Sequence, residues 1–276
     1  MELRSILLIL FYVLTFRIYA QSTASQQVNT FTIEAPQLKT HKKIWVYLPK
    51  EYQNSKNSYS VIYMHDAQNL FDASTSFVGE WKIDESLDSI SDSKAIVVGI
   101  EHGNERRIEE LTPYPHEKYG GGKGEDYINF IKNTLKPHID ITYRTLPDAK
   151  HTGIFGSSLG GLISLYAAIK YPETFGNAGL FSSAFWINKK QITEFIKNST
   201  IDSNSKFYFL VGSKEGETTE DAYQMVQDQY AIVELLKTKG ALETNIVDKV
   251  VPNGKHNETL WSTNFPDAYI WLTRDN

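Results

Sequence analysis

Eight short runs of apolar, β-branched and aromatic residues recur along the chain, each bounded by polar residues, glycine or proline. Runs of this length and content predict β-strands. They lie at residues 28–35, 43–49, 60–66, 95–101, 151–157, 177–183, 206–212 and 244–251. The joint between the first two is short, which favours an antiparallel pair. The run at 95–101 is almost continuously apolar, as in a parallel strand buried on both faces.

Segments with helical spacing of apolar residues lie between several of these runs. Helices are predicted over residues 124–139, 159–171, 221–239 and 267–273. Pro172 ends the second helix and Gly240 ends the third. The alternation of strands and helices predicts an α/β fold, with a mostly parallel eight-stranded sheet covered by helices on both faces. No internal repeat or linker divides the chain, so residues 21–276 are expected to form a single domain.

The first twenty residues have a different pattern. A charged start with Glu2 and Arg4 precedes an apolar run at residues 6–16, and the small residue Ala20 follows. This pattern predicts a secretory signal peptide, residues 1–20, that is cut after Ala20; an uncleaved membrane anchor is the alternative. Either way we expect an exported protein, periplasmic or extracellular. Residues 21–27 are polar and are expected to be a loose leader.

Composition narrows the function. The chain has 276 residues, no cysteine and a net charge of −5. The lack of cysteine excludes disulfides, thiolate catalysis and zinc–thiolate sites. The mild negative charge gives no reason to expect a nucleic-acid partner or, after signal cleavage, a membrane partner.

A glycine-flanked serine lies between the predicted strand at 151–157 and the predicted helix at 159–171. Gly156, Ser158 and Gly160 form the pattern Gly-x-Ser-x-Gly. In a nucleophile elbow the serine stands at a sharp strand-to-helix turn, and its neighbours must be small for the chain to bend. The alternative is a glycine-rich turn without chemistry.

A serine nucleophile needs a base, and the base needs an orienting carboxylate. In α/β-hydrolases these follow in the chain order Ser, Asp or Glu, His. Of the seven histidines only His256 lies after Ser158, so in this architecture His256 is the base. It lies on a loop just after an apolar strand, where catalytic groups are held by a rigid sheet.

Eleven carboxylates lie between Ser158 and His256. Glu215 comes three residues after the strand at 206–212, at the end of the sheet where a third member belongs. Glu217 is the nearest competitor. Other acids, or a working Ser–His dyad, also stay open.

An oxyanion hole needs two backbone N–H groups. One is expected from Leu159, directly after the nucleophile, and the second from the loop at residues 65–72. The most suitable donor there is Gln68, with Ala67 next. His65, Asp66 and Asp72 in this loop do not have the spacing of a metal site, so we interpret the loop as structural.

Other features have weaker interpretations. The segment YGGGKGED at 119–126 lacks the ending of a phosphate-binding loop. Trp81, Tyr114 and Trp186 fall in or beside predicted loops, where a flat ligand could stack, although packing would explain them as well. Arg106 and Arg107 could bind an acidic ligand or serve as surface charges.

Taken together, the segments HDAQNLFD, WKIDESLD, GSSLGGLISLYAAIKYPETFGNAGLFSSAFW, GSKEGE and GKHNETLW resemble the putative-esterase branch of the α/β-hydrolases. That branch contains esterase D-like enzymes, feruloyl and acetyl-xylan esterases of carbohydrate esterase family one, enterobactin-type siderophore esterases and, more distantly, mycobacterial mycolyltransferases. The resemblance covers nearly all of residues 30–273. It departs at the second oxyanion turn, where Ala67 replaces a glycine of the family pattern.

The resemblance implies a nucleophile at Ser158, an acid at Glu215 and a base at His256, with Trp261 in the expected place after the base. It implies oxyanion amides at Leu159 and Gln68, and no cofactor or metal. The predicted function is a secreted carboxylic ester hydrolase acting on a small-molecule or carbohydrate ester, with Trp186, Tyr114 and Arg106 as candidate substrate-binding residues. A siderophore trilactone esterase and a non-catalytic binding protein on the same fold are the alternatives.

Overall fold

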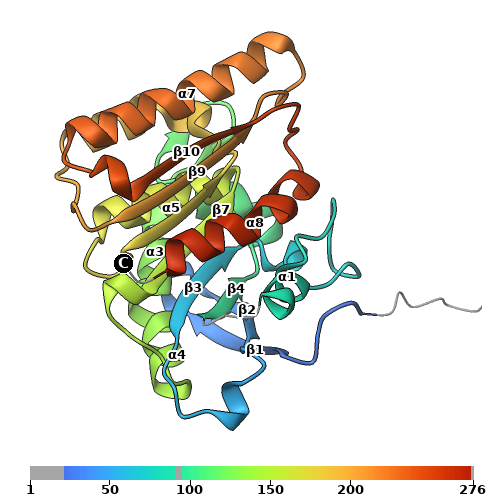
Figure 1. Cartoon of the computed structure of the whole chain (residues 1–276). Helices are drawn as coiled ribbons and strands as arrows, with labels where there is room; N and C mark the ends of the chain where they lie inside the picture. Colours follow the sequence, from blue (N-terminus) through green and yellow to red (C-terminus); the bar gives the residue numbers. More distant parts are fainter. Residues whose placement is uncertain (1–21, 91–94, 275–276) are drawn as a thin grey trace, which may run out of the picture.

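The computed structural model describes residues 22–90 and 95–274 and contains the predicted eight-stranded sheet (Figure 1). The strand order is β1-β2-β4-β3-β7-β8-β9-β10. The strands are β1 (Val28–Ala35), β2 (Thr40–Tyr47), β3 (Ser60–His65), β4 (Ala95–Ile100), β7 (Thr152–Ser157), β8 (Asn177–Phe181), β9 (Lys206–Gly212) and β10 (Ile246–Val251). A separate two-residue hairpin pairs β5 (Pro115–His116) with β6 (Gly120–Gly121). The predicted signal peptide lies outside the described residues.

Antiparallel pairings occur only at one edge of the eight-stranded sheet. Strand β1 pairs antiparallel with β2 and β2 pairs antiparallel with β4, whereas the five pairings from β4 to β10 are parallel. The prediction of a mostly parallel α/β-hydrolase sheet is therefore confirmed, including the antiparallel first pair. Because the six parallel strands point the same way, the loops that follow them gather at one edge of the sheet.

Helices cover both faces of the sheet. They are α1 (Ile83–Ser89), α2 (Arg107–Leu111), α3 (Gly124–Phe130), α4 (Lys136–Thr142), α5 (Leu159–Lys170), α6 (Lys189–Lys197), α7 (Thr219–Thr238) and α8 (Glu258–Thr273). A π-helical segment, Ile131–Leu135, joins α3 to α4, so these three occupy the predicted helix at 124–139. Figure 1 shows α8 crossing one face of the sheet, and α7 packs against β9 and β10 with its buried side chains in the core of the other face.

The prediction for the last helix was wrong at its start. Helix α8 begins at Glu258 instead of residue 267, because the Asn257 side chain accepts a hydrogen bond from Leu260 N and caps it. The helix then continues through Pro266, a residue that normally indicates a break. Helices α1, α2 and α6 were not predicted, since they have only seven, five and nine residues.

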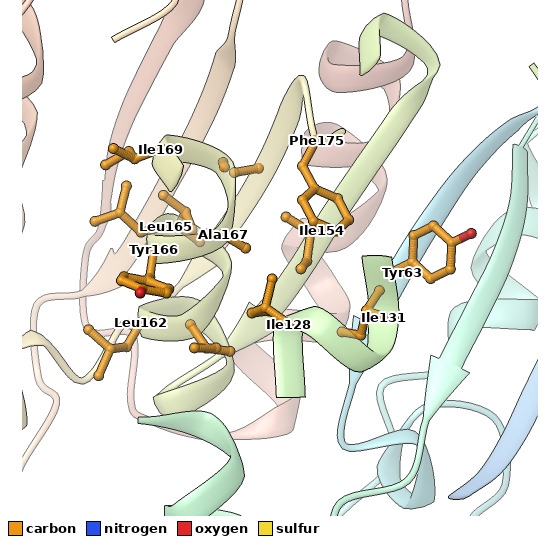
Figure 2. Packing of buried hydrophobic residues seen from close by; sticks show 14 of the residues in the cluster. Tyr63, Ile128, Ile131, Ile154, Leu162, Leu165, Tyr166, Ala167, Ile169 and Phe175 are labelled. Carbon is orange, nitrogen blue, oxygen red and sulfur yellow. The ribbon is translucent and has the colours of Figure 1, made fainter. Parts of the chain in front are cut away.

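Alternate side chains of the strands enter two separate cores. In β3, Val61 and Tyr63 pack with α3 and α5, whereas Ile62 and Met64 pack with α1 and α8 on the other face. Figure 2 shows part of the first core, in which Ile154 of β7 lies between α5 and the helix that carries Ile128. Burial on both faces fixes the register of the central strands.

The N-terminal segment is attached to a long loop instead of being loose. Ser22 Oγ donates to Asp72 (2.5 Å), Thr23 Oγ1 donates to Glu80 (3.0 Å), and Ser25 N donates to Asp84 (2.6 Å). The expectation of a loose leader is thus wrong for these residues, because two carboxylates of the loop before α1 and one in the first turn of α1 satisfy their polar groups.

Within residues 22–90 and 95–274, no helix is both long enough and apolar enough to cross a bilayer.

We expect the Leu165→Ala substitution to lower the free energy of unfolding by about 2–5 kcal/mol, because Leu165 is fully buried in α5 and its removal leaves a cavity. The matched control is Leu242→Ala, at a half-exposed leucine, for which we expect about 0.5 kcal/mol. Urea unfolding followed by circular dichroism measures both, and equal losses would contradict the assignment of the core.

Candidate active site

Ser158 occupies the turn between β7 and α5 with φ +55° and ψ −119°. This left-handed conformation is costly for a residue with a side chain and makes the hydroxyl project from the sheet edge. Position 156 must be glycine because a side chain there would collide with surrounding atoms. A Cβ at Gly156 would lie 2.7 Å from Gly160 C and 2.8 Å from the His65 ring. The predicted elbow is therefore a tight turn in which only glycine fits on the inner side.

His256 and Glu215 come together from the loops after β10 and β9. His256 Nδ1 donates to Glu215 Oε2 at 2.8 Å. The Glu215 side chain is buried, whereas His256 is about one-third exposed. The two loops approach closely because Lys214 N bonds to Gly254 O and Gly212 lies directly against Gly254. Glu217 is exposed and lies on the outer surface of the same loop, and it is not among the recorded hydrogen-bond partners of His256.

The other oxygen of Glu215 is fixed by two donors. Gly212 N and Ser182 Oγ each donate to Glu215 Oε1 at 2.5 Å. Ser182 Oγ in turn accepts a hydrogen bond from Trp261 Nε1 at 2.8 Å, and the Trp261 ring lies edge-on to His256. The sequence analysis did not identify Ser182, because no sequence pattern indicates that a serine at the end of a strand will bind Glu215.

The turn that carries Gln68 is held by a partly buried ion pair. Asp66 has φ +58° and binds Arg107 through both carboxylate oxygens, at 2.7 and 2.8 Å. Burial alone would raise the pKa of the Asp66 carboxyl, but the Arg107 charge and hydrogen bonds outweigh it and keep this pKa below its usual range. The Gln68 side chain also bonds to both backbone groups of His102.

The alanine that replaces a glycine in this turn fits without strain. The left-handed residue is Asp66 rather than Ala67, and Ala67 is fully buried against Gly99. Leu159 is the first residue of α5, so its N–H has no acceptor within the helix.

Two hollows meet at Ser158 and His256, which border both. The Arg107 cleft, of about 560 Å³, is bordered among others by Gln68, Trp81, Arg107 and Glu258. The Trp186 hollow, of about 660 Å³, is bordered among others by Tyr119, Trp186, Glu217 and Met225. The hydrogen bonds recorded for the described residues do not join the Ser158 hydroxyl to His256, and such contacts often tighten only when substrate binds.

The structure brings only one of the three candidate substrate-binding residues to either of the two hollows beside Ser158. Trp186 is half-exposed in the Trp186 hollow, edge-on to Tyr119. Tyr114 instead packs against Tyr166 beside the core. Arg106 points away towards Thr40 Oγ1, and its neighbour Arg107 borders the cleft in its place.

A comparison with protein families matches residues 35–272 to the family described as Putative esterase. The chain belongs to the Putative esterase family. It is therefore a carboxylic ester hydrolase, as the resemblance in the sequence implied.

Individual relatives agree with this family. The uncharacterized protein YbbA of Bacillus subtilis is 26% identical over 243 residues, which are 86% of this esterase and 94% of YbbA. Among solved structures, the siderophore hydrolase EstB from Aspergillus nidulans has a TM-score of 0.71 at 16% identity, over 90% of this chain and 96% of EstB.

Two further solved structures share the fold. A ferulic acid esterase has a TM-score of 0.66 at 16% identity, over 89% of this chain and 97% of its own. The enterobactin esterase FES from Shigella flexneri has a TM-score of 0.68 at 16% identity, over 91% of this esterase. This esterase spans 60% of the length of FES.

We expect Ser182→Ala to lower kcat by about 10–100-fold, because a hydrogen bond to a charged group is worth about 1.5–3 kcal/mol. The matched control is Ser183→Ala, at a buried neighbour whose hydroxyl has no recorded partner among the described residues. Steady-state hydrolysis of p-nitrophenyl acetate measures both variants. Similar kcat values for the two would show that Ser182 does not support Glu215.

Proposed function

We propose that this chain is a serine esterase in which Ser158 is the nucleophile, His256 the general base and Glu215 the orienting carboxylate. The observation that carries the proposal is the 2.8 Å bond from His256 Nδ1 to the buried Glu215, beside a serine in an elbow conformation. The bond leaves Nε2 of His256 available to accept a proton. The family membership supports the same chemistry.

The reaction has two steps. His256 Nε2 takes the Ser158 hydroxyl proton while Oγ attacks the ester carbonyl, and the Leu159 and Gln68 N–H groups stabilise the oxyanion. The alcohol leaves with the proton from His256, and an acyl-enzyme remains. Water then loses a proton to His256 and attacks the acyl-enzyme. The acid is released as His256 returns that proton to Ser158 Oγ, which restores the hydroxyl.

The substrate we favour is an acyl group on a carbohydrate. Trp186 and Tyr119 offer aromatic faces that suit the apolar face of a sugar ring. The carboxylate oxygens of Glu217 and Asp221 can accept hydrogen bonds from sugar hydroxyls. The same carboxylates would repel an anionic ferric siderophore in the Trp186 hollow.

The second candidate is a siderophore ester. The similar structures of FES and EstB favour it, and the Arg107 guanidinium is the cationic group in the cleft that an anionic ligand would meet. Export through the signal peptide at residues 1–20 is part of the proposal under either substrate, and N-terminal sequencing of the protein from culture fractions tests it.

We expect Ser158→Ala to abolish turnover and Glu215→Gln to lower kcat by about 10²–10⁴, because the amide holds His256 in the wrong tautomer. The matched control, Glu217→Gln, should stay within about threefold, which separates the two candidate acids. Turnover of p-nitrophenyl acetate by each purified variant is the measurement. Full activity of Ser158→Ala would refute the serine mechanism.

The substrate class is tested with Trp186→Ala. We expect a KM for acetylated xylo-oligosaccharides about 5–20-fold higher, because one aromatic contact is lost, and no change for p-nitrophenyl acetate. Parallel assays with methyl ferulate and a catecholate trilactone complete the panel. Preferred turnover of the trilactone, with no effect of Trp186→Ala, would favour the siderophore ester instead.

A further inference from the structure

A buried hydrogen-bonded chain lies directly beneath the elbow and has no part in the proposed chemistry. Tyr127 OH lies 2.8 Å from His65 Nδ1, and His65 Nε2 lies 3.1 Å from Ser164 Oγ. Ser164 Oγ donates to Gly160 O at 2.7 Å. The three side chains come from α3, β3 and α5, and all three are buried.

The direction of this chain follows from counting protons. A carbonyl can only accept, so the single hydroxyl proton of Ser164 goes to Gly160 O. Ser164 Oγ must then accept from His65 Nε2–H, which leaves Nδ1 to accept from the Tyr127 hydroxyl. Burial lowers the pKa of His65 to about 4, so the imidazole is neutral at the pH where esterases work.

His65 adjoins both segments that carry the proposed oxyanion amides. Along the chain, His65 directly precedes Asp66, whose turn carries Gln68. Its ring also fills the space that Gly156 and Gly160 leave open: a Cβ at Gly160 would lie 3.5 Å from the ring carbon Cδ2 of His65. A change in the ring's position would therefore move the Gln68 turn relative to the first turn of α5.

We infer that His65 is a positioning residue that sets the separation of the Gln68 and Leu159 amides, and that Tyr127 and Ser164 hold its ring in place. The inference rests on the proposed serine mechanism. It assigns the chain to stabilisation of the transition state, because the two amides meet a full negative charge only there. Loss of a whole oxyanion donor costs about 10²–10³ in rate, so a displaced donor should cost a part of that.

The most discriminating variant is Tyr127→Phe, which removes one hydroxyl and keeps the ring. Its matched control is Tyr63→Phe, because Tyr63 is equally buried in the same core and its hydroxyl has no recorded partner among the described residues. His65→Gln can restore both hydrogen bonds, with its amide donating to Ser164 and accepting from Tyr127. His65→Leu fills the space without either bond.

The readouts are kcat and KM for p-nitrophenyl acetate, and the inhibition constant of an aryl trifluoromethyl ketone, whose adduct with a serine places an oxyanion in the hole. For Tyr127→Phe we expect kcat to fall about 5–50-fold, the ketone to bind more weakly by a similar factor, and KM to change less than twofold. Tyr63→Phe should match the wild type. His65→Gln should retain more activity than His65→Leu, at similar melting temperatures.

Two results would overturn the inference. One is a folded Tyr127→Phe whose kcat and ketone affinity lie within twofold of those of Tyr63→Phe. The other is a loss of kcat without weaker ketone binding, which would leave His65 a purely structural role. Ser158→Ala is assayed beside these variants: if it keeps full turnover, the serine mechanism itself fails and the inference fails with it. Lost turnover in Ser158→Ala with normal Tyr127→Phe rejects the inference alone.

Discussion

Ser158 is held in a left-handed conformation between the last residue of β7 and the first residue of α5, and the proposed serine mechanism depends on that conformation. Such a backbone costs about 1–3 kcal/mol and persists only where its surroundings fix it. Here Ser158 N donates to Phe181 O and Ser158 O accepts from Ala184 N, both at 2.9 Å. The turn is thus fastened to the neighbouring strand β8, and its two glycines let it close against His65.

The parallel sheet explains how residues far apart in the sequence meet at this turn. Five adjacent strands, β3, β7, β8, β9 and β10, end at the same edge, and each is followed by a residue of the site. In that order the residues are Asp66, Ser158, Ser182, Glu215 and His256. A one-residue slip of any strand would turn its terminal side chain away from the others, so the two cores that fix the register also maintain the geometry of the site.

Much of this arrangement could be predicted from the sequence, for identifiable physical reasons. The strands could be found because burial on both faces demands continuous apolar runs, and His256 could be found because chain order left no other histidine. The contact between Ser182 and Glu215 could not be predicted. It depends on how closely the ends of β8 and β9 approach each other, and no local sequence pattern indicates that distance. Arg106 and Arg107 are neighbours in sequence, but successive residues at the start of α2 point in different directions. Only the fold decides which of them reaches the cleft.

The attachment of Ser22, Thr23 and Ser25 to Asp72, Glu80 and Asp84 also has a practical meaning. The same loop supplies Phe77, Val78 and Trp81 to the Arg107 cleft. Anything joined ahead of residue 22, whether an affinity tag, a lipid or a display scaffold, is therefore tethered beside the loop that borders the Arg107 cleft. Arg274, near the C-terminus, adjoins Lys206, which lies at the start of β9 and so at the opposite edge of the sheet from the site. A fusion partner added there would leave the entrance free for a polymeric substrate.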